Sequence, residues 1–450
     1  MATATLGLDK SETFGASESP LESLLGKIHR REARVGVIGL GYVGLPLALG
    51  FARAGFVVTG FDLDRRRAEQ ANFGRSYIGD VNDRSLKRQV ESGRFHATSD
   101  FAELSDVDAV SICVPTPLRK TKDPDLSYII QAVEVVADHL HRGQLIVLES
   151  TTFPGTTEEI VLPTLERSLL KTGEDFFLAF SPERVDPGNT TYQTQNIPKV
   201  VGGVTAGCAT AACALYEPCV ASIVKVSSAR SAEMVKLLEN TFRNVNIGLA
   251  NEMALLCQKF NIDVWEVIEA AGSKPFGFMP FYPGPGLGGH CIPIDPVYLT
   301  WKARANGFEP RLIEVAQQIN SRMPDHVVDR ITVALNDVGK PLRGSRVHIL
   351  GVAYKRDVAD VRESPALDIM HLLAERKARL SYSDPYVPRL SEPGMEIDSE
   401  PVSAVSQKDC VVIITDHRCV DYEQILRVAP LIVDTRNALR GRKDEKIFRL

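Results

Sequence analysis

A stretch just past the middle of the chain combines backbone freedom with a nucleophile. Residues 284–295 read Gly-Pro-Gly-Leu-Gly-Gly-His-Cys-Ile-Pro-Ile-Asp, so four glycines precede Cys291 and an aspartate, Asp295, follows it. Glycine lets a backbone take positive φ or lie close against a ligand. A thiol behind such a loop, just before a helical pattern that begins at Asp295, is positioned like a nucleophile. A glycine-rich turn followed by a buried cysteine is the alternative interpretation.

A second candidate pair lies on a long helical pattern over residues 229–260. Lys236 and Asn240 are four residues apart and so share one face of that helix. The flanking Val, Leu and Phe predict a largely buried helix, in which an unpaired lysine is costly, so we expect this pair to face a substrate. At a rise of about 1.5 Å per residue the helix is about 50 Å long, enough to link two domains and to offer a dimer face.

The N-terminal third has the pattern of a dinucleotide-binding βαβ unit. A strand at 34–38 leads into Gly39-Leu40-Gly41-Tyr42-Val43-Gly44, then a helix at 45–54 and a strand at 56–61 that ends in Asp62. The glycines let the backbone approach a pyrophosphate at the helix N-terminus. A carboxylate at Asp62 binds ribose hydroxyls and repels a 2′-phosphate, which favours NAD over NADP, although Arg65, Arg66 and Arg67 follow directly.

Strands and helices continue to alternate, with strands at 109–114, 145–149 and 176–180, helices at 127–141 and 156–169, and a further unit at 200–226. This alternation predicts a parallel sheet whose ligand crevice lies at the carboxyl ends of the strands. Polar segments follow three of those ends, and we expect them to surround the nicotinamide and the reacting carbon: Pro115-Thr116, Ser150-Thr151 and Glu183-Arg184.

A second alternation of strands and helices begins at Arg346 and predicts a degenerate nucleotide fold, with Gly351 standing alone. Basic residues near its strand ends suit phosphate groups. The predicted fold is therefore α/β, with two Rossmann-like doubly wound domains joined by a long central helix and a helical middle domain. The expected segments are an N-terminal tail (1–33), an NAD-binding Rossmann domain (34–228), a central helical or dimerisation domain (229–340) and a second Rossmann-like domain (341–450).

Composition excludes several classes of protein. The 450 residues are 44% hydrophobic with a formal net charge of −5, so no basic excess points to nucleic acid. No apolar run approaches the roughly 20 residues that cross a bilayer. The first 33 residues lack the basic and apolar regions of a signal peptide, which indicates a frayed tail on a cytoplasmic protein. Eight scattered cysteines without metal-ligand spacing predict a reducing compartment and no metal site.

Together these motifs resemble the UDP-glucose/GDP-mannose dehydrogenase family from about residue 34 to 440. The resemblance is carried by GLGYVGLPLA (39–48), SPER (181–184), KLLEN (236–240), GGHCIPID (288–295) and KRDVADVRESP (355–365). It implies an NAD-dependent, four-electron oxidation of a nucleotide-sugar C6 alcohol to a carboxylate, with residues 341–450 as the UDP-sugar-binding domain. With the dimer face offered by the long helix, we expect a homodimer or higher homo-oligomer. One departure is Lys274-Pro275. The resemblance implies an arginine at this place in the glucose enzymes, which reaches a neighbouring subunit. This chain has no arginine there, so the sequence does not predict that contact.

The resemblance also implies roles for individual residues. Cys291 matches the nucleophile, and Lys236, Asn240, Asp295, Glu183 and Thr151 match the other catalytic positions. The expected cofactor contacts are Gly39, Gly41, Tyr42, Val43, Gly44, Asp62, Arg67, Pro115, Thr116, Ser150, Thr151 and Arg362. The expected substrate contacts are Glu183, Arg184, Lys236, Asn240, Phe281, Tyr282, Gly284, Gly288, Lys355 and Arg436.

Within the family, SPERVDPGN (181–189) with PGPGLGGHCIPIDP (283–296) is most similar to the UDP-N-acetylglucosamine 6-dehydrogenase branch. UDP-N-acetylmannosamine and UDP-glucose 6-dehydrogenases remain alternatives. So does a two-electron β-hydroxyacid dehydrogenase, which shares the nucleotide fold and a Lys-x-x-x-Asn helix but needs no cysteine at 291. A catalytically silent NAD-sensing scaffold is the alternative outside enzymology.

Overall fold

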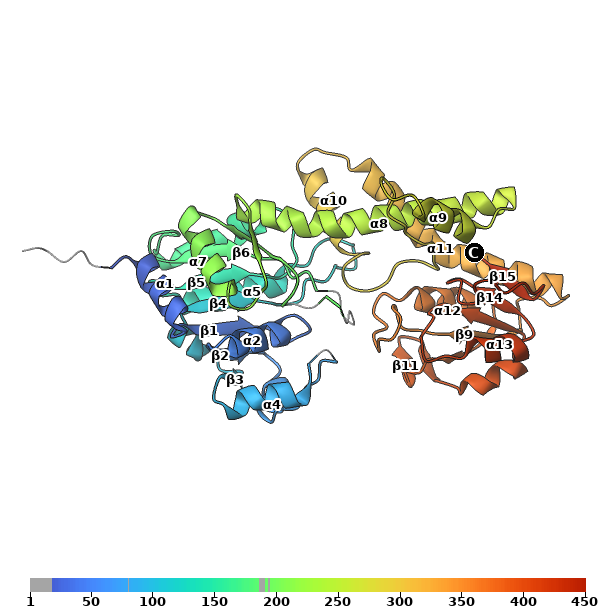
Figure 1. Cartoon of the computed structure of the whole chain (residues 1–450), viewed down its shortest axis with the longest axis horizontal. Helices are drawn as coiled ribbons and strands as arrows, with labels where there is room; N and C mark the ends of the chain where they lie inside the picture. Colours follow the sequence, from blue (N-terminus) through green and yellow to red (C-terminus); the bar gives the residue numbers. More distant parts are fainter. Residues whose placement is uncertain (1–17, 80, 186–190, 193–194) are drawn as a thin grey trace, which may run out of the picture.

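The computed structural model describes residues 18–79, 81–185, 191–192 and 195–450. Two α/β lobes lie at opposite ends of an elongated molecule, and long helices join them (Figure 1). This is the predicted fold class, with one large sheet in each lobe and a helical middle.

The N-terminal lobe is built on an eight-stranded sheet in the order β3-β2-β1-β4-β5-β6-β7-β8. Every neighbouring pair is parallel except β6 and β7, which are antiparallel, so the fully parallel sheet expected from the sequence is wrong at this pair. None of the described residues between β6 and β7 (181–185, 191–192 and 195–198) is helical, and antiparallel neighbours, unlike parallel ones, need no long crossover connection. The strands are β1 (Arg34–Ile38), β2 (Val57–Phe61), β3 (Phe95–Thr98), β4 (Ala109–Ile112), β5 (Leu145–Leu148), β6 (Phe177–Phe180), β7 (Lys199–Gly203) and β8 (Ile223–Lys225).

Helices cover both faces of this sheet, and a buried apolar cluster lies on each side of it. The strands are almost wholly apolar because both of their faces are covered. The helical segments are α2 (Gly44–Arg53), α3 (Arg65–Asn72), α4 (Asp83–Glu91), η1 (Phe101–Asp106), α5 (Ser127–Asp138), the π-helical η2 (Thr157–Val161), α6 (Leu162–Leu165), η3 (Glu166–Ser168) and α7 (Ala206–Tyr216).

The segment expected as a tail ends in a helix, α1 (Pro20–Arg30), while residues 1–17 lie outside the described part. Ser19 caps α1 through a reciprocal hydrogen-bond pair with Glu22. Leu24 and Ile28, on one face of the helix, are buried in the core beside α7. The expectation of a frayed tail is therefore wrong for this half, because its short amphipathic pattern has a partner surface.

The middle of the chain forms α8 (Ala229–Phe260), α9 (Val264–Gly272), α10 (Asp295–Ala305) and α11 (Arg311–Asp337). The predicted long helix is thus one uninterrupted element of 32 residues that runs from the first lobe to the second (Figure 1). It packs against α11, where a Cβ on Gly248 would lie 3.0 Å from that of Ala316. A side chain at position 248 would push the two helices apart.

The C-terminal lobe holds a parallel sheet in the order β10-β9-β13-β14-β15 and a separate hairpin. Its strands are β9 (Arg346–Leu350), β10 (Arg379–Ser383), β13 (Cys410–Ile413), β14 (Ile432–Asp434) and β15 (Ile447–Arg449), with the hairpin β11 (Arg389–Glu392) and β12 (Met395–Asp398). The helices are α12 (Pro365–Glu375), η4 (Val402–Gln407) and α13 (Tyr422–Val428). Within the described residues, no helix has the length and apolarity that crossing a membrane requires.

Candidate active site between the two lobes

One cavity of about 2000 Å³ joins the two lobes and the loop that carries Cys291. It collects most of the side chains predicted from sequence, although they come from segments far apart in the chain. From the first lobe it takes Gly39, Gly41, Tyr42, Val43, Asp62, Arg67, Pro115, Thr116, Ser150, Thr151, Glu183 and Arg184; from the middle Lys236, Asn240, Gly288, Cys291 and Asp295; and from the second lobe Lys355, Arg362 and Arg436.

The glycine turn after β1 has the backbone that a dinucleotide needs. Gly39 has φ of 90°, and a Cβ there would lie 2.6 Å from the carbonyl oxygen of Cys113. A Cβ on Gly44, at the start of α2, would collide with the carbonyl of Gly39. Nothing lies within 4 Å of the Cβ position of Gly41, which borders the cavity. The backbone of the turn that leads into α2 is therefore reachable by a pyrophosphate; inside the helix, Leu45 and Leu47 donate to carbonyls of this turn and Pro46 has no N–H.

Asp62, at the end of β2, is buried and oriented by the backbone. Its carboxylate accepts hydrogen bonds from the N–H groups of Leu40 (3.0 Å) and Asp64 (2.9 Å). Arg67 lies 3.8 Å from it and also packs over the ring of Tyr77. Each carboxylate oxygen keeps a second lone pair for a ribose hydroxyl, so these residues fit the adenosine end of NAD.

The loop before Cys291 is held against the second lobe. A Cβ on Gly288 would lie 2.7 Å from the carbonyl oxygen of Glu363, and one on Gly289, whose φ is 84°, would lie 2.7 Å from the ring of Tyr354. The N–H of Gly289 donates to the carbonyl of Arg362 at 3.2 Å. The glycines thus permit a close approach of loop and lobe, which brings a half-buried Cys291 to the cavity.

Lys236, Asn240 and Asp295 form a polar group beside this thiol. Asn240 donates through its Nδ2 to Asp295 at 2.5 Å, and Lys236 donates through its Nζ to the carbonyl of Glu183 at 2.5 Å. All three side chains are buried. Burial raises the pKa of Asp295 to about 6, although the charge of Lys236 and the hydrogen bond from Asn240 lower it. The carboxyl can therefore exchange a proton near neutral pH.

Three asparagines that sequence reasoning missed tie this group to the loop and to α11. Asn244 donates to the carbonyl of Ile292 at 3.1 Å, and Asn320 donates to the carbonyl of Asn244 at 3.0 Å. Asn251 donates to Asn320 at 2.9 Å and accepts from the N–H of Gly284 at 2.9 Å. The spacing of Asn244, four residues after Asn240 on α8, was the available signal.

A buried ion-pair network behind Glu183 was also missed. Lys199 lies 2.6 Å from the carboxylate of Glu149 and 3.8 Å from that of Glu183. The hydroxyl of Tyr216 donates to Glu149 as well. Burial opposes the charge of Lys199, but the two carboxylates prevail and raise its pKa. Lys199 therefore holds Glu183 at the cavity edge. The sequence does not show this arrangement, because the three paired residues lie in separate segments of the chain.

The second lobe brings guanidinium groups to the cavity. Arg362 pairs with Asp360 and stacks over the ring of Tyr42 at 5.0 Å, so it joins the lobe to the glycine turn. Arg436 donates to the carbonyl of Ile414 at 2.8 Å, and burial together with the charge of Arg356 lowers its pKa to about 10. Arg356 itself pairs with Asp416. Arg436 therefore remains a cation at neutral pH on the border of the cavity.

Several predicted residues lie outside the lining of this cavity. Phe281 packs edge-on against Phe242 of α8, and Tyr282 stacks on Trp265 of α9 at 5.9 Å. Gly284 lies behind the lining, where a Cβ would reach the guanidinium of Arg436 at 2.6 Å. Arg184 borders the cavity but is paired with Glu239. Residues 186–189 of the predicted SPERVDPGN segment lie outside the described residues.

The geometry defines a class of protein. A glycine turn and a helix N-terminus open onto the same cavity as a cysteine, a lysine, an amide and a carboxyl group with a raised pKa. No group of three or more potential metal ligands occurs in the part of the chain that the structure describes. The protein is an NAD-dependent dehydrogenase.

The chain belongs to the UDP-glucose/GDP-mannose dehydrogenase family. Residues 33–220 match its NAD binding domain, residues 230–322 its central domain and residues 348–441 its UDP binding domain. The chain is 36% identical to a UDP-N-acetyl-D-glucosamine 6-dehydrogenase of Salmonella typhi, over 86% of this chain and 90% of that one. It is also 36% identical to an NDP-N-acetyl-D-galactosaminuronic acid dehydrogenase of Ralstonia solanacearum, over 89% and 95%.

Among solved structures, the UDP-D-ManNAc dehydrogenase of Pyrococcus horikoshii superposes with a TM-score of 0.85 at 36% identity. The match covers 92% of this chain and 98% of that one. The names of these relatives thus refer to different N-acetylated sugars, and each match spans most of both chains.

Proposed function

We propose that the protein oxidises the C6 hydroxyl of a UDP-N-acetylhexosamine, with UDP-GlcNAc as the preferred candidate, to the uronic acid in two NAD-dependent steps. The observation that carries this proposal is the position of Cys291. It lies in one cavity with the glycine turn of the first lobe and the basic residues of the second. The similarity to dehydrogenases of three N-acetylated nucleotide sugars supports the N-acetylhexosamine class.

The residues that would hold NAD are those of the glycine turn, with Asp62 on the adenosine ribose and Arg362 over Tyr42 at the opposite side of the cavity. Bound there, NAD supplies the hydride acceptor for each oxidation of C6. Lys355 and Arg436 suit the two phosphates of the sugar nucleotide, since both border the cavity from the lobe that matches a UDP binding domain.

In the first oxidation a base must remove the proton of the C6 hydroxyl. Asp295, whose pKa is raised to about 6, is mostly ionised at neutral pH, and we assign the proton to it through a water that Lys236 orients. Lys236 and Asn240 then stabilise the oxygen as charge develops on it, a role commonly worth about 3 kcal/mol per donor.

The aldehyde formed at C6 is reactive, and the Cys291 thiolate captures it before release. The sulfur bonds to the carbon and the carbonyl oxygen takes a proton, giving a thiohemiacetal. Loss of the C6 hydride and the hydroxyl proton in the second oxidation leaves a thioester on Cys291. Water activated by Glu183 or Asp295 attacks the thioester, releases the acid and returns the thiol.

The test is the yield of NADH per sugar in parallel assays with UDP-GlcNAc, UDP-ManNAc, UDP-GalNAc and UDP-glucose. Two NADH per sugar with at least one N-acetylated substrate is the expected result. One NADH per sugar would indicate a two-electron β-hydroxyacid-type dehydrogenase, and inactivity with all four would indicate an NAD-sensing scaffold. A preference for UDP-glucose would overturn the sugar assignment alone.

The exposed side of α8 supports a homodimer or higher homo-oligomer as the active form. Phe242, Leu249 and Leu256 recur every seven residues, lie on one stripe of the helix and are all exposed. The loop after α9 also exposes apolar side chains, Phe276, Phe278 and Met279. Light scattering should give at least a dimer mass for the native chain and a monomer mass for Leu249→Asp; a monomeric native chain would contradict this.

We also place the enzyme in the cytoplasm. None of the eight cysteines, all of which the structure describes, forms a disulfide. Structural disulfides are rare in reducing compartments, and the proposed thiol chemistry needs a reduced Cys291. Fractionation of cells that express the native chain should recover the activity with cytoplasmic markers.

A further inference from the structure

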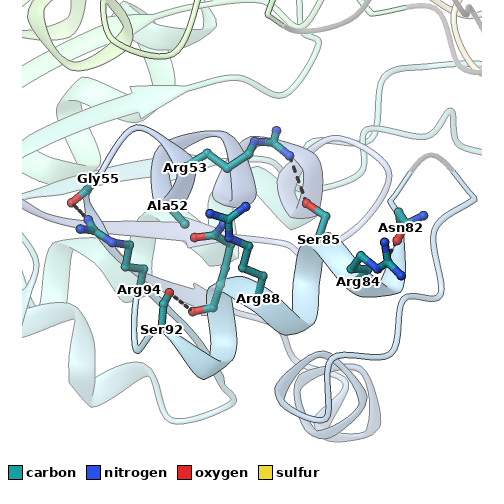
Figure 2. Close-up of a pocket in the computed structure, with 10 residues that line it drawn as sticks. Ala52, Arg53, Gly55, Asn82, Arg84, Ser85, Arg88, Ser92 and Arg94 are labelled. Atoms are coloured by element: carbon teal, nitrogen blue, oxygen red, sulfur yellow. Dashed lines mark hydrogen bonds between the residues drawn. The ribbon is translucent and has the colours of Figure 1, made fainter.

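A second, smaller cavity lies on the outer side of the first lobe. Its volume is about 670 Å³, and it opens between the C-terminal end of α2 and helix α4. Figure 2 shows Arg53 from α2 and Arg88 from α4 in this gap, with Arg94 crossing toward Gly55. No cysteine, histidine or acidic residue lines it. Its lining is Ala52, Arg53, Gly55, Asn82, Arg84, Ser85, Arg88, Gln89, Ser92 and Arg94.

The four arginines of this cavity have no carboxylate partner among the residues that the structure describes. Arg53 has only a long hydrogen bond of 3.5 Å to the hydroxyl of Ser85, and Arg94 donates to the carbonyl of Gly55. Partial desolvation lowers the pKa of Arg53, the direction expected for a cation without a counter-charge. Exposed arginines elsewhere in the chain commonly have such a partner, as Arg65 has Glu69 at 2.9 Å.

The acidic residues of α4 are directed elsewhere. Asp83 accepts the N–H of Ser76 at 2.7 Å, and Glu91 pairs with Lys87 at 3.7 Å. A chain of net charge −5 thus concentrates four unneutralised guanidinium groups in one concave site. Like charges so arranged repel one another, and an anion that bridges them removes this cost.

We propose that this cavity, the arginine pocket, binds a small ligand that carries two or more phosphate groups, at a site separate from the cofactor and substrate cavity. Planar guanidinium groups bind phosphate oxygens in pairs, and the hydroxyl of Ser85, which accepts a hydrogen bond from Arg53, adds a neutral donor. The volume suits a pyrophosphate or a nucleotide, and the concave shape favours such a ligand over an extended polyanion.

The pocket can be tested through Arg84 and Arg88, which lie outside the large cavity, whereas Arg53 borders both. The full-length enzyme is first saturated with NADH and UDP, so that its two nucleotide-binding lobes are occupied. Inorganic pyrophosphate and, separately, ATP are then titrated by isothermal calorimetry at low salt. The native chain should bind one further equivalent, and Arg84→Gln/Arg88→Gln should weaken this binding at least about 10-fold.

The matched control is Arg167→Gln/Arg343→Gln, which changes two exposed arginines that also lack a carboxylate partner among the described residues. Its affinity should stay within about twofold of the native chain. Equal affinities for the two probes identify pyrophosphate recognition, and tighter ATP binding identifies a nucleotide site. Three results would overturn the proposal. They are no saturable binding of either probe up to about 10 mM, an equal loss of affinity in the two double variants, and binding of heparin by a chain that binds neither probe.

Discussion

The two lobes begin with the same local geometry and put it to different uses. Gly39 follows β1 and Gly351 follows β9, with φ of 90° and 83°. Each donates its N–H to the last residue of the neighbouring strand, Phe61 at 2.7 Å and Ser383 at 2.9 Å. An aspartate follows each of those strands. The lone Gly351 therefore marks a true counterpart of the glycine turn, although the sequence motif around it is absent.

The two aspartates differ in what they bind. Asp62 accepts two backbone N–H groups and borders the large cavity. Asp384 accepts four, from Val352, Ala353, Tyr386 and Val387, and also contacts His417 at 3.1 Å. Burial opposes ionisation of Asp384, but these hydrogen bonds prevail and lower its pKa. The first acid remains available to a ligand, while the second is fully engaged by its own lobe.

The helices that follow the glycines also differ. In the first lobe α2 begins at Gly44 and presents its N-terminus to the cavity, whereas in the second α12 begins only at Pro365. The intervening loop, 352–364, carries Lys355 and Arg362 to the cavity. One half thus offers backbone N–H groups to an anion and the other offers cations. The same fold thus presents two different kinds of group that suit a phosphate, backbone N–H groups in one lobe and cationic side chains in the other.

The largest expected effect concerns the residue placed between the lobes. Cys291→Ser removes the nucleophile, so acid formation should fall by more than about 1000-fold while NAD binding stays intact. Single-turnover assays with mass spectrometry of the enzyme would measure both acid and any trapped adduct. Cys419→Ser, an exposed thiol in the second lobe, is the control. Acid formation at the native rate by Cys291→Ser would contradict the covalent route.

The next largest expected effect is the loss of stability in Asp384→Ala. It leaves several buried N–H groups without an acceptor, so the unfolding free energy should fall by about 3 to 5 kcal/mol. Urea unfolding measures this, and the KM for NAD should stay unchanged in the folded variant. Asp398→Ala, which changes an exposed acid in the same lobe, should cost less than about 0.5 kcal/mol. A raised KM for NAD with little loss of unfolding free energy would contradict the purely structural role of Asp384.

The raised pKa of Asp295, at the junction of the lobes, predicts that the unfolding free energy depends on pH. Its pKa is raised to about 6 in the folded chain, so the folded state binds more protons than the unfolded state between about pH 4 and 6. The unfolding free energy should therefore fall with rising pH across this window, by about 2 to 3 kcal/mol from this group. The difference between the native chain and Asp295→Asn in urea midpoints from pH 4 to 7.5 isolates it. A difference that does not vary with pH would contradict the raised pKa.

The smallest expected effect is on cofactor choice. Asp62→Ala removes the acceptor for the adenosine ribose, so the KM for NAD should rise about 10-fold, or about 1.4 kcal/mol, and that for NADP should fall. Initial rates with each cofactor measure the ratio. Glu69→Ala, on α3 and outside the cavity, should leave both values unchanged. An unchanged KM for NAD in Asp62→Ala would contradict a role of Asp62 in binding the cofactor, and neither aspartate would then be a ligand contact.

Much of this protein could be predicted from local patterns in its sequence. The glycine turn with Asp62, the uninterrupted α8 and the loop that ends at Cys291 follow from φ requirements and helical periodicity, which act over a few residues. Most of the predicted site residues line one cavity, because the carboxyl ends of parallel strands converge on it.

The tertiary structure alone decided the interactions between distant segments. The antiparallel β7, the Lys199 network behind Glu183, the packing of Phe281 on α8 and the engagement of Asp384 depend on which surfaces meet. A turn residue has the same sequence signature whether it faces a ligand or a neighbouring helix. Only the folded chain shows the difference, because burial and charge depend on neighbours that lie far away along the sequence.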